Sequence, residues 1–299
     1  MDWDDLRVFL AVARAESLSG AGKRLALDPA TVGRRIARLE ESSGTALFAK
    51  SPLGYVLTEE GTRLMPHAEA AETAMEGARE ALAVPVGPGR GLSGQVRLGA
   101  PDGCANYLLP QVLKQICDEN PGLEVQIVAL PRVFNLSKRE ADMAIGVSRP
   151  EAGRLKVQKL TDYRLHLAAD PAYLSKAPPL RHPGDLKDHR MVGYIPDMIF
   201  DKELDYLGQL GVGTVNLASN SVSVQLNLLR AGVGVGIVHD FALPFAPGLR
   251  KVLADQVGLT RAFWLIRHEG DARAPRLNRF ADLLAVGLRR EVQRLEAQT

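Results

Sequence analysis

The sequence predicts a protein of two parts, a small helical module at the N-terminus and a larger domain of mixed α and β structure. Residues 1–45 show apolar positions at helical spacing, interrupted by capping residues. From Gly94 onward, short apolar strands alternate with amphipathic helices, as in α/β domains. A long helical stretch over residues 59–84 separates the two parts. The length of 299 residues agrees with more than one domain.

The composition is that of an ordinary globular protein with a nearly balanced charge. The chain is 46% hydrophobic and has a formal net charge of +2. No apolar run reaches the ~18 residues of a membrane helix, and the acidic start MDWDDLRVF does not resemble a signal peptide. Cys104 and Cys117 form no disulfide framework. We therefore expect a cytoplasmic protein without a membrane partner, and any nucleic-acid-binding surface must be local.

Short helices fill the first part of the N-terminal module. The first is predicted over Asp4–Arg14. Ser17-Leu18-Ser19 offers a hydroxyl cap for a second helix over Gly20–Leu25. Asp28 followed by Pro29 is a typical start for a third helix, because Asp accepts free N–H groups and Pro suits the first helical position.

The third helix carries a basic face. Val32, Ile36 and Leu39 form its buried stripe, so the neighbouring arginines must project outward. Arginine suits both phosphate and the guanine edge, and residues near the start of a recognition helix reach base edges. A solvated basic face is the alternative. The residues expected to contact DNA here are Ser19, Lys23, Pro29, Ala30, Thr31, Gly33, Arg34, Arg35 and Arg38.

A β-hairpin is predicted directly after these helices. Thr45–Phe48 and Gly54–Thr58 are short β-prone runs, and the loop Ala49–Leu53 between them carries Lys50. Helices followed by such a hairpin describe a winged helix-turn-helix, a module that binds double-stranded DNA. We expect Lys50 to contact phosphate.

The stretch LSGAGKRLALDPATVGRRIARLEESSGTALFAKSPLGYVLTEEG resembles the DNA-binding signature of LysR-type transcriptional regulators, in the branch with T-V-x-R-R. The match is dense and free of gaps, and it includes V-x-R-x-I-x-x-L-E, G-x-x-L-F and G-Y-x-L-T-x-x-G. Two positions depart from the family pattern. Many members have glutamine at Pro29 and serine at Gly33, so the resemblance implies the module but not its operator sequence.

A long linker helix is predicted from Glu59 to about Val84, capped by Thr58. Its small and apolar residues alternate at spacings of 4 and 3, which favours helix–helix pairing over burial in one domain. The resemblance implies an antiparallel pair of such helices in a homodimer, or in a homotetramer. A single packed helix is the alternative. The predicted seam is Leu64, Ala68, Ala71, Met75, Ala78 and Leu82.

The C-terminal part is predicted to contain a parallel sheet with helices on both faces. Strands are expected at 95–99, 123–130, 142–147, 164–169, 191–195, 214–217, 234–239 and 262–266, and helices at 107–119, 136–140, 221–231 and 275–295. The motifs R-E-A-D-M-A-I, D-P-A-Y-L and L-L-R-A-G-V-G-V-G-I resemble the effector domain of the same family. That resemblance implies a two-lobed fold like that of periplasmic binding proteins.

The domain boundaries follow from these elements. We expect a winged helix-turn-helix at 1–58, the linker helix at 59–84, a Pro- and Gly-rich hinge at 85–93, and the effector-binding domain at 94–299. Lobe one would comprise 94–162 and 268–299, and lobe two 163–267.

Loops at the carboxyl ends of the strands are the expected effector site. Asn220 or Ser221 could cap the following helix or donate to an anionic ligand. Asp102 could instead cap its own helix, and its charge disfavours an acid beside it. His239 is expected to be titratable or to form a structural hydrogen bond. The predicted residues are Pro101, Asp102, Gly103, Cys104, Val147, Ser148, Ile195, Pro196, Met198, Asn220, Ser221, Val222 and His239.

The sequence therefore predicts a transcriptional regulator that binds DNA as a dimer or tetramer and responds to a small organic effector. An enzyme is the first alternative, but no catalytic motif, cofactor-binding loop or metal-ligand spacing is present. The second is a thiol redox sensor of the same family that uses Cys104. The third is a solute-binding transport protein, which would lack a DNA-binding module.

Overall fold

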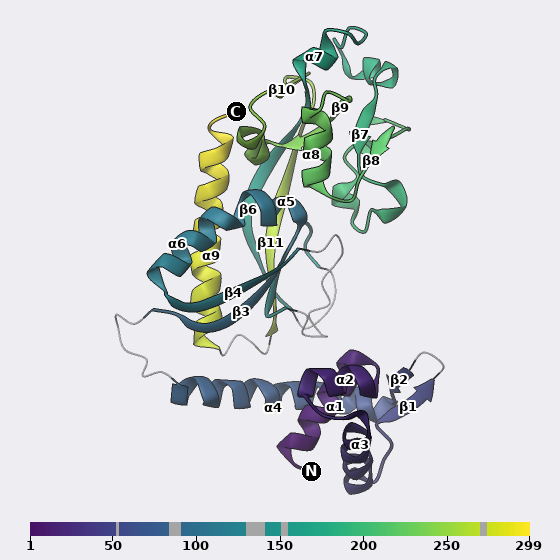
Figure 1. Ribbon diagram of the computed structural model, residues 1–299, viewed down its shortest axis with the longest axis vertical. Coiled ribbons are helices and arrows are strands. Elements are labelled where there is room, and N and C mark those ends of the chain that lie inside the picture. Colours follow the sequence, from purple (N-terminus) through teal and green to yellow (C-terminus); the bar gives the residue numbers. More distant parts are fainter. Residues whose placement is uncertain (52–53, 84–90, 130–140, 151–154, 270–273) are drawn as a thin grey trace. The chain divides into compact units, whose positions relative to one another are not determined.

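A computed structural model describes residues 1–51, 54–83, 91–129, 141–150, 155–269 and 274–299 (Figure 1). The chain divides into two compact units, one of residues up to Arg90 and one beginning at Gly91. Within the described residues, no helix has both the length and the apolar character needed to cross a bilayer.

The helices of the N-terminal unit begin at the predicted caps. Ser17 Oγ accepts the N–H of Gly20 at 3.1 Å, and Asp28 Oδ1 accepts the N–H of Thr31 at 2.9 Å. Thr58 Oγ1 accepts the N–H of Gly61 at 3.0 Å. These bonds satisfy N–H groups that a helix start leaves free. The elements are α1 (Trp3–Ala15), α2 (Leu18–Leu25), α3 (Pro29–Ser43), β1 (Phe48–Ser51), β2 (Gly54–Leu57) and α4 (Glu59–Ala83).

The hairpin forms later in the chain than the sequence predicted. Thr45–Leu47 are not strand, and Lys50 lies within β1 rather than in a loop. The reason is Glu40, whose Oε1 accepts the N–H groups of Leu47 at 2.7 Å and Phe48 at 3.1 Å. This carboxylate holds the chain before β1, so antiparallel pairing begins with Phe48 opposite Leu57.

Gly54 fixes the hairpin to the turn between α1 and α2. Its φ is +125°, and a Cβ there would lie 2.2 Å from the carbonyl oxygen of Glu16. The neighbouring N–H of Tyr55 donates to the same oxygen at 2.8 Å. Only glycine permits this approach, which holds the wing beside the helices.

The start of α4 packs against its own chain. Ala68 is completely buried, and Leu64 and Met65 contact the same core as Phe9. Arg14 and Glu72 add a bidentate ion pair at 3.0 and 2.6 Å. The assignment of Ala68 to a dimer seam is therefore wrong, because helix α1 already covers it.

The later residues of the predicted seam are more exposed than its first residues. Ala71 is half-buried, whereas Met75 and Ala78 are exposed. The side chain of Leu82 lies outside the described residues. Only the later part of the seam thus offers surface to another helix.

The C-terminal unit, as far as the structure describes it, is built on one nine-stranded sheet of order β4-β3-β5-β11-β6-β9-β7-β8, with β10 paired to β6. The expectation of a parallel sheet holds for only part of it. β3, β4 and β5 pair in parallel, as do β7, β8 and β9, but β6 and β11 run antiparallel to their neighbours and to each other. Figure 1 shows these two long strands crossing the unit. The strands are β3 (Ser93–Ala100), β4 (Gly122–Ala129), β5 (Met143–Gly146), β6 (Leu155–Ala169), β7 (Met191–Gly193), β8 (Leu217–Ala218), β9 (Val235–His239), β10 (Arg250–Lys251) and β11 (Gly258–His268).

The helices of this unit largely follow the prediction. The helix expected at 107–119 forms over Leu109–Glu119, and a separate short helix that was not predicted precedes it at Asp102–Tyr107. The helix expected at 136–140 lies outside the described residues. The α-helices are α5 (Asp102–Tyr107), α6 (Leu109–Glu119), α7 (Pro171–Leu174), α8 (Val222–Arg230) and α9 (Pro275–Glu296), and the 3-10 helices are η2 (Pro183–Asp188), η3 (Pro196–Met198), η4 (Lys202–Leu204), η5 (Gly208–Leu210) and η6 (Asp240–Phe245).

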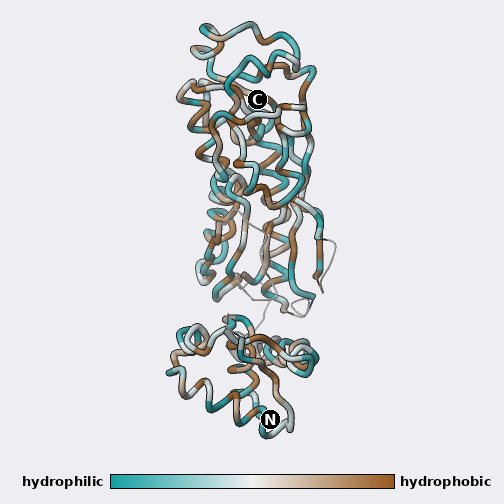
Figure 2. Tube along the Cα trace, turned by 90° about the vertical axis from the view of Figure 1, so that its right-hand side faces the viewer, coloured by the Kyte–Doolittle hydropathy of each residue, from teal (hydrophilic) through white to brown (hydrophobic). Residues whose placement is uncertain are grey.

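Helices α6 and α9 lie together on one face of the sheet (Figure 1). A Cβ at Gly287 would come within 2.6 Å of Val112 Cγ1, so the two helices are in close contact. Figure 2 shows hydrophobic stretches recurring along the strands and helices, in line with a buried core that includes Leu98, Leu265 and Leu284. Leu92, predicted as hinge, is buried there, and its N–H donates to Asn120 Oδ1. The lobe boundaries remain a prediction.

Candidate nucleic-acid interface and effector cleft

Helices α2 and α3 present the predicted DNA-binding residues on the outside of the N-terminal unit. Thr31, Gly33 and Arg35 are half-buried. The exposed ones are Ser19, Lys23, Pro29, Ala30, Arg34, Arg38 and Lys50. The apolar stripe of α3 is buried as predicted, so the outward direction of this face follows from the core.

A chain of hydrogen bonds shapes the first turns of α3. Thr31 Oγ1 donates to Asp28 Oδ2 at 2.6 Å and accepts from Arg34 Nη2 at 2.9 Å. The bond from Thr31 is the main reason that the pKa of Asp28 is lowered. Arg34 forms no ion pair within the described part of the chain. Its guanidinium keeps donors for a base or a phosphate.

Arg38 and Arg35 have a structural role that the sequence did not predict. Arg38 Nε donates to Asp5 Oδ2 at 3.0 Å, and its Nη2 also reaches the buried Asp5 carboxylate. Arg35 Nη1 lies 3.8 Å from Asp4 and 3.9 Å from Asp5. These pairs tie α3 to the start of α1, although the side chain of Arg38 remains exposed as expected.

In the C-terminal unit, α5 meets the start of α8 through Asp102. Its Oδ2 accepts the N–H of Ser223 at 3.0 Å, the hydroxyl of Ser221 at 3.0 Å and the hydroxyl of Ser223 at 3.2 Å. Its Oδ1 accepts from Asn106 at 3.0 Å. The alternative that Asp102 caps its own helix is wrong. Pro101 precedes α5 without a side-chain cap, and the carboxylate lies on α8 instead.

Ser221 is the helix cap, as one of the predicted alternatives had it. Its Oγ accepts the N–H of Val224 at 3.3 Å and donates to Asp102. Val222 beside it is buried against Gly103. Asn220 is half-buried. The helix start expected to receive an anionic ligand therefore already holds a carboxylate of the chain itself.

A second bridge joins the loops that follow β5 and η3. Ser148 Oγ donates to Asp201 Oδ2, while Asp201 Oδ1 accepts the N–H of Glu203 at 2.9 Å. Val147 next to Ser148 is buried. Asp201 and Ser223 escaped sequence analysis because their partners lie 53 and 121 residues away.

An aromatic cluster is buried in the interior of the C-terminal unit. Tyr163 stacks on Phe263 at 4.2 Å between ring centroids and on His239 at 5.4 Å. Tyr206 meets His239 edge-on at 6.1 Å. Burial lowers the pKa of His239 to about 4, while the charges of Asp240 and Asp102 act in the opposite direction. This imidazole is therefore neutral at pH 7.

The cluster contains polar atoms without partners. Among the described residues, His239 Nδ1 has no hydrogen-bond partner and the ring is 5% exposed. The structural hydrogen bond expected for His239 is thus absent from this nitrogen. Buried polar atoms usually have a hydrogen-bond partner. A buried nitrogen without one could therefore bond to a ligand.

Cys104 lies inside this region. The thiol is completely buried, and burial raises its pKa far above the usual range. Thiolate is the reactive form of cysteine, so this environment opposes oxidation. Cys117 is half-buried.

A cavity of about 160 Å³ shares Tyr206 with the cluster and is also lined by residues of β7, α8 and β9. Its lining is mostly apolar and includes Tyr194, Pro196, Ile199 and Tyr206, while Asp205 supplies a carboxylate. Of the remaining predicted residues, Ile195 is half-buried and Met198 is 46% exposed.

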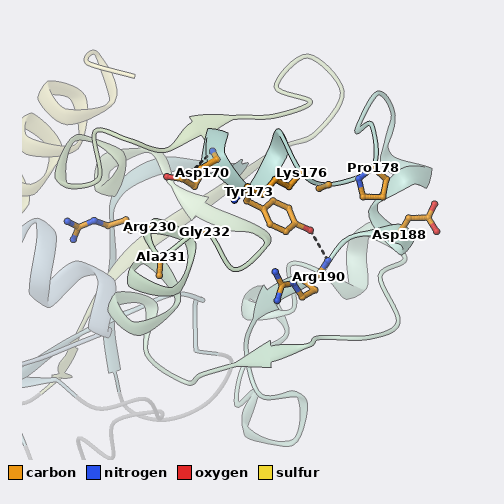
Figure 3. A pocket seen from close by; sticks show the side chains of 11 residues that line it. Asp170, Tyr173, Lys176, Pro178, Asp188, Arg190, Arg230, Ala231 and Gly232 are labelled. Atoms are coloured by element: carbon orange, nitrogen blue, oxygen red, sulfur yellow. Dashed lines mark hydrogen bonds between the residues drawn. The ribbon is translucent and has the colours of Figure 1, made fainter.

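A larger hollow of about 680 Å³ lies elsewhere on this unit, near α7 and the end of α8 (Figure 3). Tyr173 is central to it. Its hydroxyl accepts the N–H of Arg190 at 3.1 Å, and the guanidinium of Arg190 lies 5.8 Å from its ring centroid. No predicted effector residue lines this hollow.

Each of the two units matches a known protein family model. Residues 3–62 match the family model "Bacterial regulatory helix-turn-helix protein, lysR family", and residues 89–288 match "LysR substrate binding domain". The chain is 28% identical to the transcriptional regulator DgdR of Burkholderia cepacia over 82% of this chain and 80% of that protein. It is also 26% identical to the transcriptional regulator CrgA of Neisseria meningitidis, over 94% of this chain and 95% of that protein.

The fold is that of full-length family members. The structure of a full-length OxyR variant from Pseudomonas aeruginosa superposes with a TM-score of 0.70 at 19% identity, covering 96% of this chain and 94% of that one. With both family models matched in order along the sequence, the chain belongs to the LysR family, whose members are DNA-binding transcriptional regulators controlled by an effector-binding domain.

Proposed function

We propose that the first turns of α3 read operator DNA, with Arg34 on a base edge and with Lys23 and Lys50 on phosphates. The observation that carries this assignment is the contrast among the arginines of α3. Arg38 and Arg35 are held by the acids of α1, whereas Arg34 is oriented by Thr31 and keeps its charge for another molecule. A free, oriented guanidinium at the start of an outward helix suits base readout.

We further propose that the protein binds DNA as a dimer that pairs through the later part of α4. Met75 is a large hydrophobic side chain with 39% exposure on this helix, and Ala78 beside it permits close approach. A dimer would place the two copies of α3 at two half-sites. Such a regulator acts in the cytoplasm, where it meets DNA, and the names of its curated relatives support regulation rather than catalysis.

The proposed effector site is the region around Asp102, His239 and the cavity lined by Tyr194 and Tyr206. It joins α5 and β5 to α8 and the η3 loop, so a ligand held there would change how these segments meet. A redox mechanism through Cys104 has less support, because its thiol is buried and its pKa is raised.

The experiment is a selection of genomic fragments by the purified full-length protein, repeated at increasing salt. We expect a small set of fragments to survive salt that removes random DNA, because base contacts are less salt-dependent than phosphate contacts. Retention of random and genomic DNA alike at every salt concentration would contradict sequence-specific regulation.

A further inference from the structure

We propose that Asp102 is a specificity-determining residue that excludes carboxylates from the effector cleft, so that the effector of this protein is an uncharged or cationic organic molecule. The inference rests on the proposed effector site and names the ligand class that it accepts.

The first step is the position that the Asp102 carboxylate occupies. The N–H of Ser223 and the hydroxyls of Ser221 and Ser223 all converge on one of its oxygens, at 3.0, 3.0 and 3.2 Å. These donors belong to the first turn of α8, where the helix dipole favours a negative charge. An acidic ligand would need the same donors, and Asp102 has already taken them.

The second step is the charge around the cleft. The other bridge, from Ser148, ends on Asp201, and the adjoining cavity is lined by Asp205. Within the described residues, neither Asp102 nor Asp201 has an ion-pair partner. The nearby Arg261 is occupied by Glu203 at 2.9 Å and by Gln209. An added carboxylate would therefore meet the like charges of Asp102, Asp201 and Asp205.

The third step is the orphaned polar surface. His239 Nδ1 is buried and has no hydrogen-bond partner among the described residues, and its ring meets the buried ring of Tyr206 edge-on. The charge of Asp102 is one of the influences on the pKa of His239, where it opposes the lowering by burial. Neutral imidazole and phenol can each donate or accept a hydrogen bond, so it is the negative charge of Asp102 that favours a donor such as an amide or an amine here.

The test compares simple probes of one shape on the full-length protein. Binding of benzoate and benzamide is measured by calorimetry on the wild type, Asp102→Ser and Asp102→Asn. Asp255→Ser is the control, because it removes one exposed carboxylate elsewhere on the same unit. We expect Asp102→Ser to bind benzoate at least about tenfold more tightly than the wild type and the control do, because the donors of α8 become free and a like charge is lost.

Equal benzoate affinity in the wild type and Asp102→Ser, whether both bind or neither does, would overturn the proposal. Should Asp102→Ser not fold, Asp102→Asn makes the same comparison, since it keeps an oxygen for Ser223 and removes only the charge. DNA binding by the same preparations is measured separately. Its absence in the wild type would overturn the proposed function while leaving the benzoate comparison intact.

Discussion

The carboxylate of Asp102 lies 3.0 Å from the backbone nitrogen of Ser223, and this contact joins α5 to α8 across 121 residues of sequence. It places a charge of the protein at the position where the sequence suggested that an anionic ligand would bind. The effector domain is therefore held together at its proposed ligand site by its own side chains, and a ligand must compete with or add to these contacts.

Arg38 is expected to stabilise the fold rather than to read DNA. Arg38→Ala should lower the melting temperature of the N-terminal unit, because the buried carboxylate of Asp5 loses its main partner. Arg34→Ala should leave the melting temperature unchanged, since Arg34 is exposed and its one hydrogen bond among the described residues goes to the hydroxyl of Thr31 on the same helix. Thermal unfolding followed by circular dichroism measures both. Equal melting temperatures for the two variants would show that the Arg38–Asp5 pair contributes nothing.

Gly33→Ala should fold normally and still bind operator DNA less tightly. A Cβ at this position meets only Leu18 Cδ1 at 3.5 Å, an ordinary contact, and alanine favours a helix over glycine by up to ~1 kcal/mol. Gly54→Ala is the contrasting variant and should destabilise the wing, because its Cβ would strike the Glu16 carbonyl. Unchanged operator affinity in Gly33→Ala would mean that the backbone there does not approach DNA.

Lys50 should act on all DNA sequences alike. It is exposed on β1 and is expected to contact phosphate, so Lys50→Ala should reduce operator and random-DNA affinity by the same factor and lower the salt slope by about 1. Anisotropy titrations at several salt concentrations measure the slope. A selective loss of operator affinity would instead assign Lys50 to a base.

Mutations can separate the residues of α4 that pack within the chain from those proposed to form the dimer contact. Met75→Asp should give a folded monomer, because Met75 is exposed in the single chain. Ala68→Asp should unfold the N-terminal unit, because it buries a charge against α1. Light scattering and circular dichroism distinguish the outcomes. A folded dimer of Met75→Asp would exclude the later part of α4 as the dimer contact.

His239 makes the effector domain sensitive to acid. Its pKa is lowered from 6.5 to about 4 by burial, so the unfolded chain binds more protons than the folded one between these values. Stability should fall as pH decreases from 6.5 to 4, by up to roughly 3 kcal/mol. His239→Phe, which fits the aromatic cluster, should flatten this dependence in urea unfolding. An identical pH profile in the variant would show that another group titrates.

Local signals made the N-terminal unit predictable. Ser17, Asp28 and Thr58 start their helices as their sequence context indicates, because capping depends on the next few residues. Glu40 bonds to Leu47 and Phe48, which are seven and eight residues away in the sequence. These contacts are too distant to be read from local sequence, so the predicted start of the hairpin was wrong.

The features that the sequence did not predict depend on tertiary contacts. The full length of β6 was not predicted, because its first residues pair with β11 about a hundred positions later and show no regular alternation. A heptad spacing predicts that a helix face is covered, but not whether the covering helix belongs to the same chain or to another. Ala68 was assigned to the dimer seam for this reason. The contacts of Asp102 with Ser221 and Ser223 depend on the folding of distant segments and left no signal in the sequence.

The most direct test of operator recognition by α3 is the ratio of dissociation constants for a selected genomic fragment and for random DNA of equal length, in the wild type and in Arg34→Ala. Arg230→Ala is the control, since it removes one exposed arginine from the other unit. Loss of a base contact predicts that the ratio falls in Arg34→Ala by the equivalent of ~1–3 kcal/mol and stays unchanged in the control. An unchanged ratio in Arg34→Ala would contradict the account, because the first turns of α3 would then not read the operator.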